Sequence, residues 1–219
     1  MAKLMRRLFC ILPVLLLMAC TSGSDVVRVG KLLLNSVGPV EKITRERAAA
    51  TPYATMGLQL GSSPQALLIL GTSMGDELDW FAGENVFVAT RHGRVIRTAG
   101  LPYDLGGIRP LNATVGENRN AGAAPMLSSV DFQDLGVFGA TALCSSRNAG
   151  DDNVEILGAS IATRHIVEHC EVQALRWKFD NDFWEDRSSG YVWRSRQYIH
   201  PKSPPIILEV LRPERNTSN

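Results

Sequence analysis

The stretch that decides the fold is residues 181–199, NDFWEDRSSGYVWRSRQYI. Two runs that contain aromatic residues, Asn181–Asp186 and Tyr191–Ile199, flank the short segment Arg187–Gly190. Aromatic residues favour sheets, and a Ser-Ser-Gly sequence between two such runs is typical of a turn. The pattern therefore predicts a β-hairpin near the end of the chain.

Similar strand signals occur in most of the preceding sequence, separated by turn residues. His92-Gly93 is predicted to be a two-residue hairpin turn and Asn148–Asp152 a second turn. Residues 106–126 are predicted to be a long loop in which brief extended pieces can occur. The expected strands are Ala54–Leu60, Gln65–Leu70, Val86–Arg91, Arg94–Thr98, Val130–Ser145, Val154–Thr163, Ile166–Trp177 and Ile206–Leu211.

Successive strands are not separated by helical patterns, which argues against a parallel sheet with crossover helices. The predicted fold is mainly β: an antiparallel meander curved into a barrel or half-barrel, with one short N-terminal helix. We place that helix at Asp25–Val37, ended by Gly38-Pro39, and expect it to dock on the domain. Its apolar residues at helical spacing are Val26, Val27, Gly30, Leu33, Leu34 and Val37.

The first twenty residues have the layout of a secretory signal peptide. Lys3, Arg6 and Arg7 precede the apolar run Leu8–Leu17, which is too short to span a membrane. The run ends at Leu17-Met18-Ala19-Cys20, which resembles the lipobox of bacterial lipoproteins. In that class the leader is cut before the cysteine, which then carries lipid. We therefore expect a signal peptide over 1–19, a lipidated tether over 20–24, one β-rich domain over 25–213 and a polar tail over 214–219.

The lipid on Cys20 is the only cofactor-like group that we expect. A single acyl chain binds a membrane only marginally, whereas the diacylglycerol and N-acyl chains (palmitate, for example) of this class give a stable anchor. Thr21 follows the cysteine, and the absence of Asp at that position favours the outer membrane, with the domain facing the periplasm. Loss of three basic leader residues takes the formal net charge from +1 to −2, so nucleic acid is not an expected partner.

Two cysteines remain for the folded domain after Cys10 leaves with the leader and Cys20 is lipidated. Because the periplasm is oxidising, Cys144 and Cys170 either form a disulfide or stay as two small buried thiols.

Two patterns suggest chemistry. Gly71–Gly75 reads G-x-S-x-G, as in serine hydrolases, but the alternating helices of an α/β-hydrolase are missing, so we interpret it as a turn and assign no catalytic residue. His165, His169 and Cys170 would suit a metal only on a helix. On the expected strand both histidines point outward, opposite to Cys170, and no metal site is expected.

Three tryptophans and three arginines gather in or near the last hairpin. Sugars stack on aromatic faces, while packing within the sheet is the competing explanation. The candidates for contact with a glycan or a partner protein are Trp184, Trp193, Arg194 and Arg196.

Several short motifs also occur in a characteristic order. They are Pro52–Met56, Leu70-Gly71, Trp80, Asn85, Gly93-Arg94, Gly100-Leu101, Asp104-Leu105, Phe183-Trp184-x-Asp186, Gly190, Ser195-Arg196-Gln197 and Pro205–Pro213. Together they resemble the YjbF/GfcB family, the group 4 capsule or exopolysaccharide lipoproteins of Gram-negative bacteria. The resemblance runs from the lipobox to about Pro213.

This resemblance implies a barrel-like outer-membrane lipoprotein that serves the assembly or export of polysaccharide. It also implies two partners, an outer-membrane export barrel and a periplasmic capsule-assembly protein, with polysaccharide as a third candidate. The leading hypothesis is a non-enzymatic accessory factor. The alternatives are a carrier of lipids or lipoproteins with an apolar cavity, and a serine hydrolase that uses Ser73.

Overall fold

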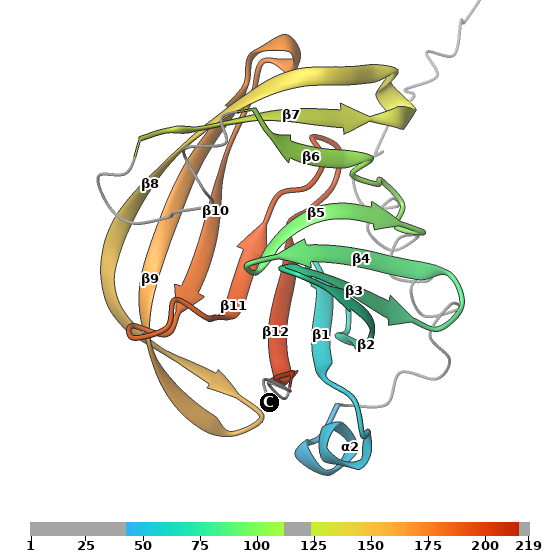
Figure 1. Ribbon diagram of the computed structural model, residues 1–219, viewed down its shortest axis with the longest axis vertical. Helices are drawn as coiled ribbons and strands as arrows, with labels where there is room; N and C mark the ends of the chain where they lie inside the picture. Colours follow the sequence, from blue (N-terminus) through green and yellow to red (C-terminus); the bar gives the residue numbers. More distant parts are fainter. Residues whose placement is uncertain (1–42, 112–123, 215–219) are drawn as a thin grey trace, which may run out of the picture.

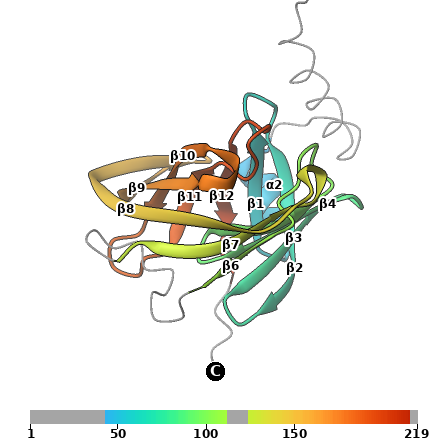
Figure 2. The same cartoon turned by 90° about the horizontal axis from the view of Figure 1, so that it is seen from above.

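A computed structural model describes residues 43–111 and 124–214. They form a twelve-stranded antiparallel sheet in the order β5-β4-β3-β2-β1-β12-β11-β10-β9-β8-β7-β6. Every neighbouring pair is consecutive in the chain except β1 and β12, so the sheet is a meander whose first and last strands pair. The sheet curls into a nearly closed barrel (Figure 1), with β8–β12 curving to one side and β1–β4 to the other when seen from above (Figure 2). The predicted fold class is confirmed.

In chain order, the elements are α2 (Arg45–Ala50), β1 (Thr55–Leu60), β2 (Ala66–Met74), β3 (Glu77–Ala82), β4 (Val86–Arg91), β5 (Arg94–Ala99), β6 (Gly107–Pro110), β7 (Met126–Phe132), the 3-10 turn Gln133–Leu135, β8 (Val137–Ile156), β9 (Ala159–Val172), the 3-10 turn Gln173–Leu175, β10 (Trp177–Glu185), β11 (Val192–Gln197) and β12 (Ile206–Arg212).

The two edge strands, β5 and β6, meet at a seam that a short loop closes. The backbone N–H of Thr98 donates to the carbonyl of Leu105 at 2.9 Å, and the Leu105 N–H donates to the Thr98 hydroxyl at 2.9 Å. The carboxylate of Asp104 accepts from the Thr98 hydroxyl and from the N–H groups of Gly100 and Leu101. The end of β5 is thus covered by the segment that joins it to β6, which limits edge-to-edge association there.

Inward-facing apolar side chains fill the barrel. Strands of an antiparallel sheet alternate inward and outward residues, and the buried set follows that period. The most deeply buried apolar side chains include Leu58, Leu68, Trp80, Val88, Phe132, Ile166, Phe183 and Ile206.

The predicted turn at His92-Gly93 is confirmed. Both residues have positive φ, 47° and 76°, as a two-residue hairpin turn requires. A Cβ on Gly93 would lie 2.5 Å from the Cβ of Val192, so glycine also lets this hairpin approach β11.

The predicted turn at Asn148–Asp152 is wrong. Strand β8 continues through these residues with an irregular register between Asn148 and Gly150, and it reverses only at Leu157-Gly158. Turn-favouring residues can form a bulge inside a strand when the partner strand, here β9, continues to pair before and after them. The expected long loop likewise contains β6, and β3 was missed because its sequence mixes charged and apolar residues.

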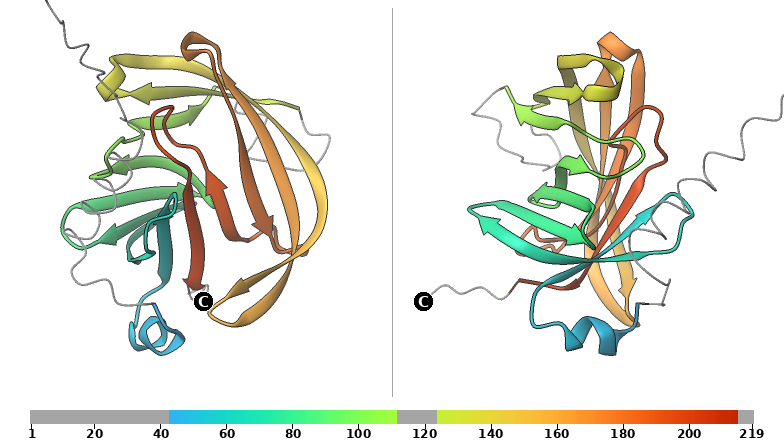
Figure 3. Two further views of the ribbon diagram at one scale, coloured as in Figure 1. Left: turned by 180° about the vertical axis from the view of Figure 1, so that it is seen from behind. Right: turned by 90° about the vertical axis from the view of Figure 1, so that its right-hand side faces the viewer.

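The short helix α2 lies at the foot of β1 and touches the tip of the β8–β9 hairpin (Figure 3). Thr44 caps it by accepting a hydrogen bond from the Arg47 N–H, and the Arg45 guanidinium donates to the carbonyl of Leu157 at 2.7 and 3.2 Å. The predicted signal peptide, tether and helix at Asp25–Val37 lie outside the described residues. Among the helices that the structure describes, none is long and apolar enough to cross a membrane.

Candidate functional site

A buried ion pair lies at the centre of the barrel interior. The Arg94 guanidinium of β5 donates to both carboxylate oxygens of Glu168 on β9, at 2.7 and 2.5 Å, and the side chains are 4% and 1% exposed. The Asn181 amide of β10 also donates to Glu168, at 3.3 Å. These contacts join strands from opposite walls of the barrel.

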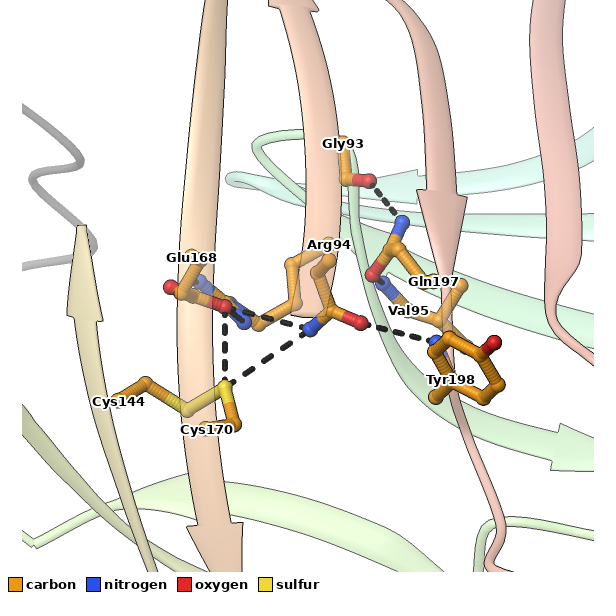
Figure 4. A network of polar contacts seen from close by, with 9 residues as sticks. Gly93, Arg94, Val95, Cys144, Glu168, Cys170, Gln197 and Tyr198 are labelled. Atoms are coloured by element: carbon orange, nitrogen blue, oxygen red, sulfur yellow. Dashed lines mark hydrogen bonds and ion pairs between the residues drawn. A yellow bond between two sulfur atoms is a disulfide. The ribbon is translucent and has the colours of Figure 1, made fainter. Parts of the chain in front are cut away.

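Gln197 of β11 makes a second link to β5 (Figure 4). Its side-chain oxygen accepts from the Val95 N–H at 3.0 Å, and its side-chain nitrogen donates to the Gly93 carbonyl at 2.8 Å. Strand β5 lies at an edge of the sheet and pairs only with β4, so some backbone groups on its other side need partners from elsewhere. Gln197 supplies hydrogen-bond partners to two such groups.

The network leaves little space. A cavity of about 30 Å³ lies among Arg94, Asn181, Gln197 and the apolar side chains around them. This volume is enough for roughly one water molecule.

Cys144 and Cys170 lie beside the network as a direct cross-strand pair, joined by a disulfide with an S–S distance of 2.09 Å. Their sulfur atoms and a Glu168 oxygen lie within 4.8 Å of one another. Among the described residues, this is the only cluster of three side chains of the kinds that bind metal ions. Metal binding needs thiolates, which the disulfide removes. We therefore interpret this cluster as structural.

A groove opens on the barrel wall beside the first half of β10, and we call it the β10 groove. Its volume is about 340 Å³, within the range of about 300–1,000 Å³ typical of small-molecule sites. The residues that line it are Trp177, Lys178, Phe179, Asp180, Arg196 and Tyr198.

The groove exists because β10 and β11 separate. Strand β10 pairs with β9 along its whole length, but within the described chain its pairing with β11 begins only at Asp182. Beyond Gln197 the Tyr198 N–H donates to the side chain of Asn181, and prolines 201, 204 and 205 follow. Proline has no N–H to donate to a ladder, so this segment turns away from β10 and leaves its edge open.

Aromatic rings form the wall between the groove and the barrel interior. Trp177 and Phe179 are stacked with ring centroids 4.0 Å apart, and Tyr198 lies 6.1 Å from Phe179. The same three residues also line the interior cavity, so the wall is one ring thick.

Charged side chains border the groove in ion pairs. Lys178 pairs with Glu171 at 3.0 Å, and Asp180 pairs with His169 at 2.7 Å, both between β9 and β10. On the other side, Arg196 pairs with Asp182 at 3.2 Å and donates to the Tyr198 hydroxyl at 3.0 Å. The Arg196 guanidinium also lies 5.1 Å from the centre of the Tyr198 ring. The groove thus holds aromatic rings, donors and acceptors side by side.

The structure places only one of the four predicted contact residues in the groove, namely Arg196. Trp184 lies on the outer face between its cross-strand neighbours: the His165 ring stacks on it at 4.7 Å, and the Arg194 guanidinium lies 6.0 Å from its centroid. Trp193 packs against the core. Contact of these residues with a glycan or partner stays a prediction.

The outer-face stack around Trp184 is fixed by polar contacts at its edges. The indole N–H donates to Asp152 at 2.8 Å, and this bond, followed by one from the Asn153 N–H, holds the pKa of Asp152 below its usual range. Arg194 is bonded to Glu209 through its Nε at 2.7 Å. The stack therefore ties β8 to β12 across the sheet.

Sequence reasoning missed Trp177, Phe179 and Tyr198 as a group. Trp177 belongs to the tryptophan cluster near the last hairpin. Its ring and that of Phe179 on β10 meet Tyr198, which follows β11, only because the pairing of these two strands ends there. The signal that was present is the run of prolines after Tyr198, which limits how far β11 can extend.

The G-x-S-x-G pattern has a structural explanation. Ser73 lies at an exposed position within β2 and not in a strand-to-helix turn. The turn that we predicted over Gly71–Gly75 is therefore wrong for residues 71–74, which belong to this strand, and the chain turns only at Gly75. A Cβ on Gly71 would lie 2.6 Å from the Phe81 ring, and Gly75 has a φ of 59° in the turn before β3. Gly71 thus leaves space for the Phe81 ring, and Gly75 allows the turn before β3.

A second hollow, which we call the end pocket, lies where the hairpin turns gather at one barrel end. Its volume is about 330 Å³. Its apolar lining includes Met56, Leu78, Trp80 and Val210, and its rim includes His92 and Tyr191. The Trp80 indole N–H donates to the Thr90 hydroxyl at 2.9 Å, so the buried donor in this pocket has its partner.

A family model described as group 4 capsule polysaccharide lipoprotein GfcB, YjbF matches residues 32–211. The chain belongs to the YjbF family. Two relatives from Escherichia coli K12 agree. The uncharacterized lipoprotein YjbF is 27% identical over 95% of this chain and 98% of its own length, and the uncharacterized lipoprotein GfcB is 23% identical over 78% and 81%. The expected family resemblance is confirmed, and with it a capsule-related lipoprotein role.

The fold of this YjbF-family protein also has a solved counterpart. The hypothetical lipoprotein YmcC from Escherichia coli K12 matches with a TM-score of 0.63 and 23% identity, covering 89% of this chain and 97% of that one. At that identity the likeness shows a shared fold.

His200 lies beside the groove wall, in an aromatic cluster with Tyr103 and Phe132 at centroid distances of 5.1 and 5.3 Å. Its Nδ1 accepts the Lys202 N–H at 3.1 Å, so its Nε2 carries the proton and donates to Asp134 at 2.9 Å. Burial lowers the pKa of His200 from its usual 6.5, although the bond to Asp134 opposes that shift.

Our first prediction concerns the central ion pair. Glu168→Gln should destabilise the protein by about 3–5 kcal/mol in urea unfolding, because it leaves the buried Arg94 charge without its counter-charge. The matched control is Glu171→Gln on the same strand, whose exposed pair with Lys178 should contribute less than about 1 kcal/mol. The double change Arg94→Met with Glu168→Leu should cost less than Glu168→Gln alone. Equal effects at positions 168 and 171 would contradict this interpretation.

The second prediction concerns pH. Because the pKa of His200 is lower in the folded state than in the unfolded chain, the unfolded chain binds the proton first as pH falls below about 6.5. Stability should therefore decrease from pH 7 towards pH 5. Urea midpoints of His200→Gln, which keeps a donor for Asp134, should fall less steeply over that range than those of the wild type. Parallel pH profiles would rule out the assigned role.

Proposed function

We propose that this protein is a lipid-anchored accessory factor of the outer membrane, facing the periplasm, that assists capsule polysaccharide assembly or export by binding rather than by catalysis. Family membership supports the link to capsule, and the β10 groove supports a binding role. The proposal places the anchor at Cys20, as the lipobox resemblance implies.

The β10 groove has the chemistry that a saccharide needs. The C–H faces of sugar rings pack on aromatic rings, and the Trp177, Phe179 and Tyr198 side chains supply these. Sugar hydroxyls both donate and accept hydrogen bonds, and Arg196, Lys178 and Asp180 supply donors and acceptors at the rim. The open edge of β10 allows an elongated chain to continue beyond the lined segment.

Arg196 carries most of the argument for specificity. Its side chain is 37% exposed, and the Asp182 carboxylate and the Tyr198 hydroxyl hold the guanidinium at the groove. A guanidinium can donate two parallel hydrogen bonds, which suits vicinal hydroxyls or a carboxylate on a sugar. Asp182 of β10 also contacts His165 of β9 at 2.9 Å, so the carboxylate that holds Arg196 is itself held from the next strand.

The third prediction tests the groove. Lys178→Gln with Arg196→Gln should weaken binding of purified capsule polysaccharide by about tenfold or more, since two charge-assisted hydrogen bonds are lost. The same variant should restore less surface capsule than wild type in a strain that lacks the gene. The measurements are calorimetry for binding and quantified capsule for export.

Arg187→Gln is the matched control, because Arg187 is 54% exposed on the β10–β11 turn and pairs with Asp151 outside the groove. It should leave both readouts unchanged. If the wild-type protein bound no polysaccharide, or if the groove variant and the control supported equal capsule, the assignment of this groove would be abandoned.

The end pocket favours a second candidate, a carrier of lipids or lipoproteins. Its apolar lining resembles the sites that accept hydrocarbon chains. The interior cavity of about 30 Å³ is lined by other residues, so it adds no volume to the end pocket.

The fourth prediction separates the two functions. On our proposal, organic extraction of the purified protein followed by mass spectrometry should yield no stoichiometric lipid beyond the anchor on Cys20. A carrier would yield bound lipid that decreases when Leu78→Trp fills the end pocket and stays constant in Leu143→Trp, an exposed position on β8.

A further inference from the structure

Both basic side chains that line the β10 groove already face a carboxylate. The Lys178 ammonium lies 3.0 Å from Glu171, and the Arg196 guanidinium lies 3.2 Å from Asp182. Ammonium and guanidinium groups have several N–H donors, so a hydroxyl of a ligand can accept a hydrogen bond from either cation without displacing its partner. A carboxylate of a ligand would instead approach a cation whose charge is already matched, with a second carboxylate beside it.

Carboxylates outnumber cations around the groove. Asp180 is the acidic residue of the lining, and Glu171 and Asp182 lie behind the two cations. Two cations against three carboxylates leave one negative charge in excess when His165 and His169, which contact the aspartates, are counted as neutral. The groove therefore does not have the charge of an anion site, although it contains a lysine and an arginine.

The Asp180 carboxylate needs a hydrogen-bond donor from the ligand. Its side chain is 58% exposed, and His169 contacts its Oδ1 atom at 2.7 Å. An ionised carboxylate only accepts hydrogen bonds, so the groups that it can bind in a ligand are hydroxyl and N–H groups. A sugar carboxylate at the same place would meet a like charge, which is costly in an interface.

The contacts of Arg196 favour separate hydroxyls over a carboxylate. Its Nη1 donates to Oδ2 of Asp182 at 3.2 Å, and its Nη2 donates to the Tyr198 hydroxyl at 3.0 Å. Each terminal nitrogen keeps a second N–H, and two hydroxyls of one sugar can accept one each. The other oxygen of Asp182 contacts His165, so this carboxylate stays at the guanidinium and a second one would lie next to it.

We propose that the β10 groove takes uncharged sugars and discriminates against acidic sugars such as uronates. The inference rests on the proposed saccharide-binding role of the groove and names the class of saccharide. Vicinal hydroxyls, and not a carboxylate, are then the groups that Arg196 binds. Because an uncharged ligand brings no long-range attraction for ions to screen, its affinity depends little on salt.

The test compares two forms of the same purified capsule polysaccharide, measured by calorimetry with the full-length protein. In one form the carboxyl groups are reduced to primary alcohols, and in the other the primary alcohols are oxidised to carboxylates, so the linkages are the same. The affinity for the reduced form should be higher by about tenfold or more. It should change by less than about twofold between roughly 0.01 and 0.15 M salt.

Equal affinities, tighter binding of the oxidised form, or a steep fall with salt for the reduced form would overturn the inference and leave the saccharide-binding role intact. If neither form bound, the proposed function would fail together with the inference.

A pair of variants separates the effect of charge from the loss of primary hydroxyls. Asp180→Asn removes the exposed charge and keeps an acceptor, so it should raise the affinity for the oxidised form by about fivefold. Asp151→Asn is the matched control, because Asp151 is 66% exposed on β8 and pairs with Arg187 outside the groove. It should leave both affinities unchanged. Equal behaviour of the two variants would show that Asp180 does not select the ligand, and would overturn the inference.

Discussion

The ion pair between Arg94 and Glu168 is the contact on which the rest of the barrel depends. Two charges removed from water cost several kcal/mol each, so they persist inside a protein only with close counter-charges and hydrogen bonds. In this barrel the guanidinium is held by both carboxylate oxygens, and Asn181 also donates to Glu168. Because Arg94 is on β5 and Glu168 is on β9, satisfying these charges fixes the distance between opposite walls.

The same requirement determines where the wall opens. Asn181 bonds to Glu168 through its nitrogen and accepts the Tyr198 N–H through its oxygen, so the residue after β11 is fixed to a side chain instead of to the β10 backbone. Prolines then direct the chain away, and the β10 groove forms beside the gap. The interior network and the β10 groove therefore lie on opposite sides of the same three aromatic rings, and Asn181 helps to form both.

Regular alternation and tight turns made much of the fold predictable. The His92-Gly93 turn followed from local chemistry alone, because two residues between strands must both adopt positive φ. The Asn148–Asp152 turn was wrong, because a long hairpin can carry turn-favouring residues in a bulge when the partner strand continues to pair. Strand β6 could not be located within the loop predicted over residues 106–126, because its pairing with β7 depends on residues far along the chain.

The sequence by itself determined the strand-rich class, the meander and the family, because these depend on local periodicity and on the order of short motifs. Of the contact residues that it predicted in the last hairpin, Arg196 lines the β10 groove, and a role of any of them in binding stays a prediction. Only the tertiary structure decided that Trp193 packs inward, that Trp184 is stacked between neighbours, and that Trp177 and Tyr198 share a groove with Arg196. Those outcomes depend on which strands stay paired and where a ladder ends, and that is set by contacts between residues far apart in the chain.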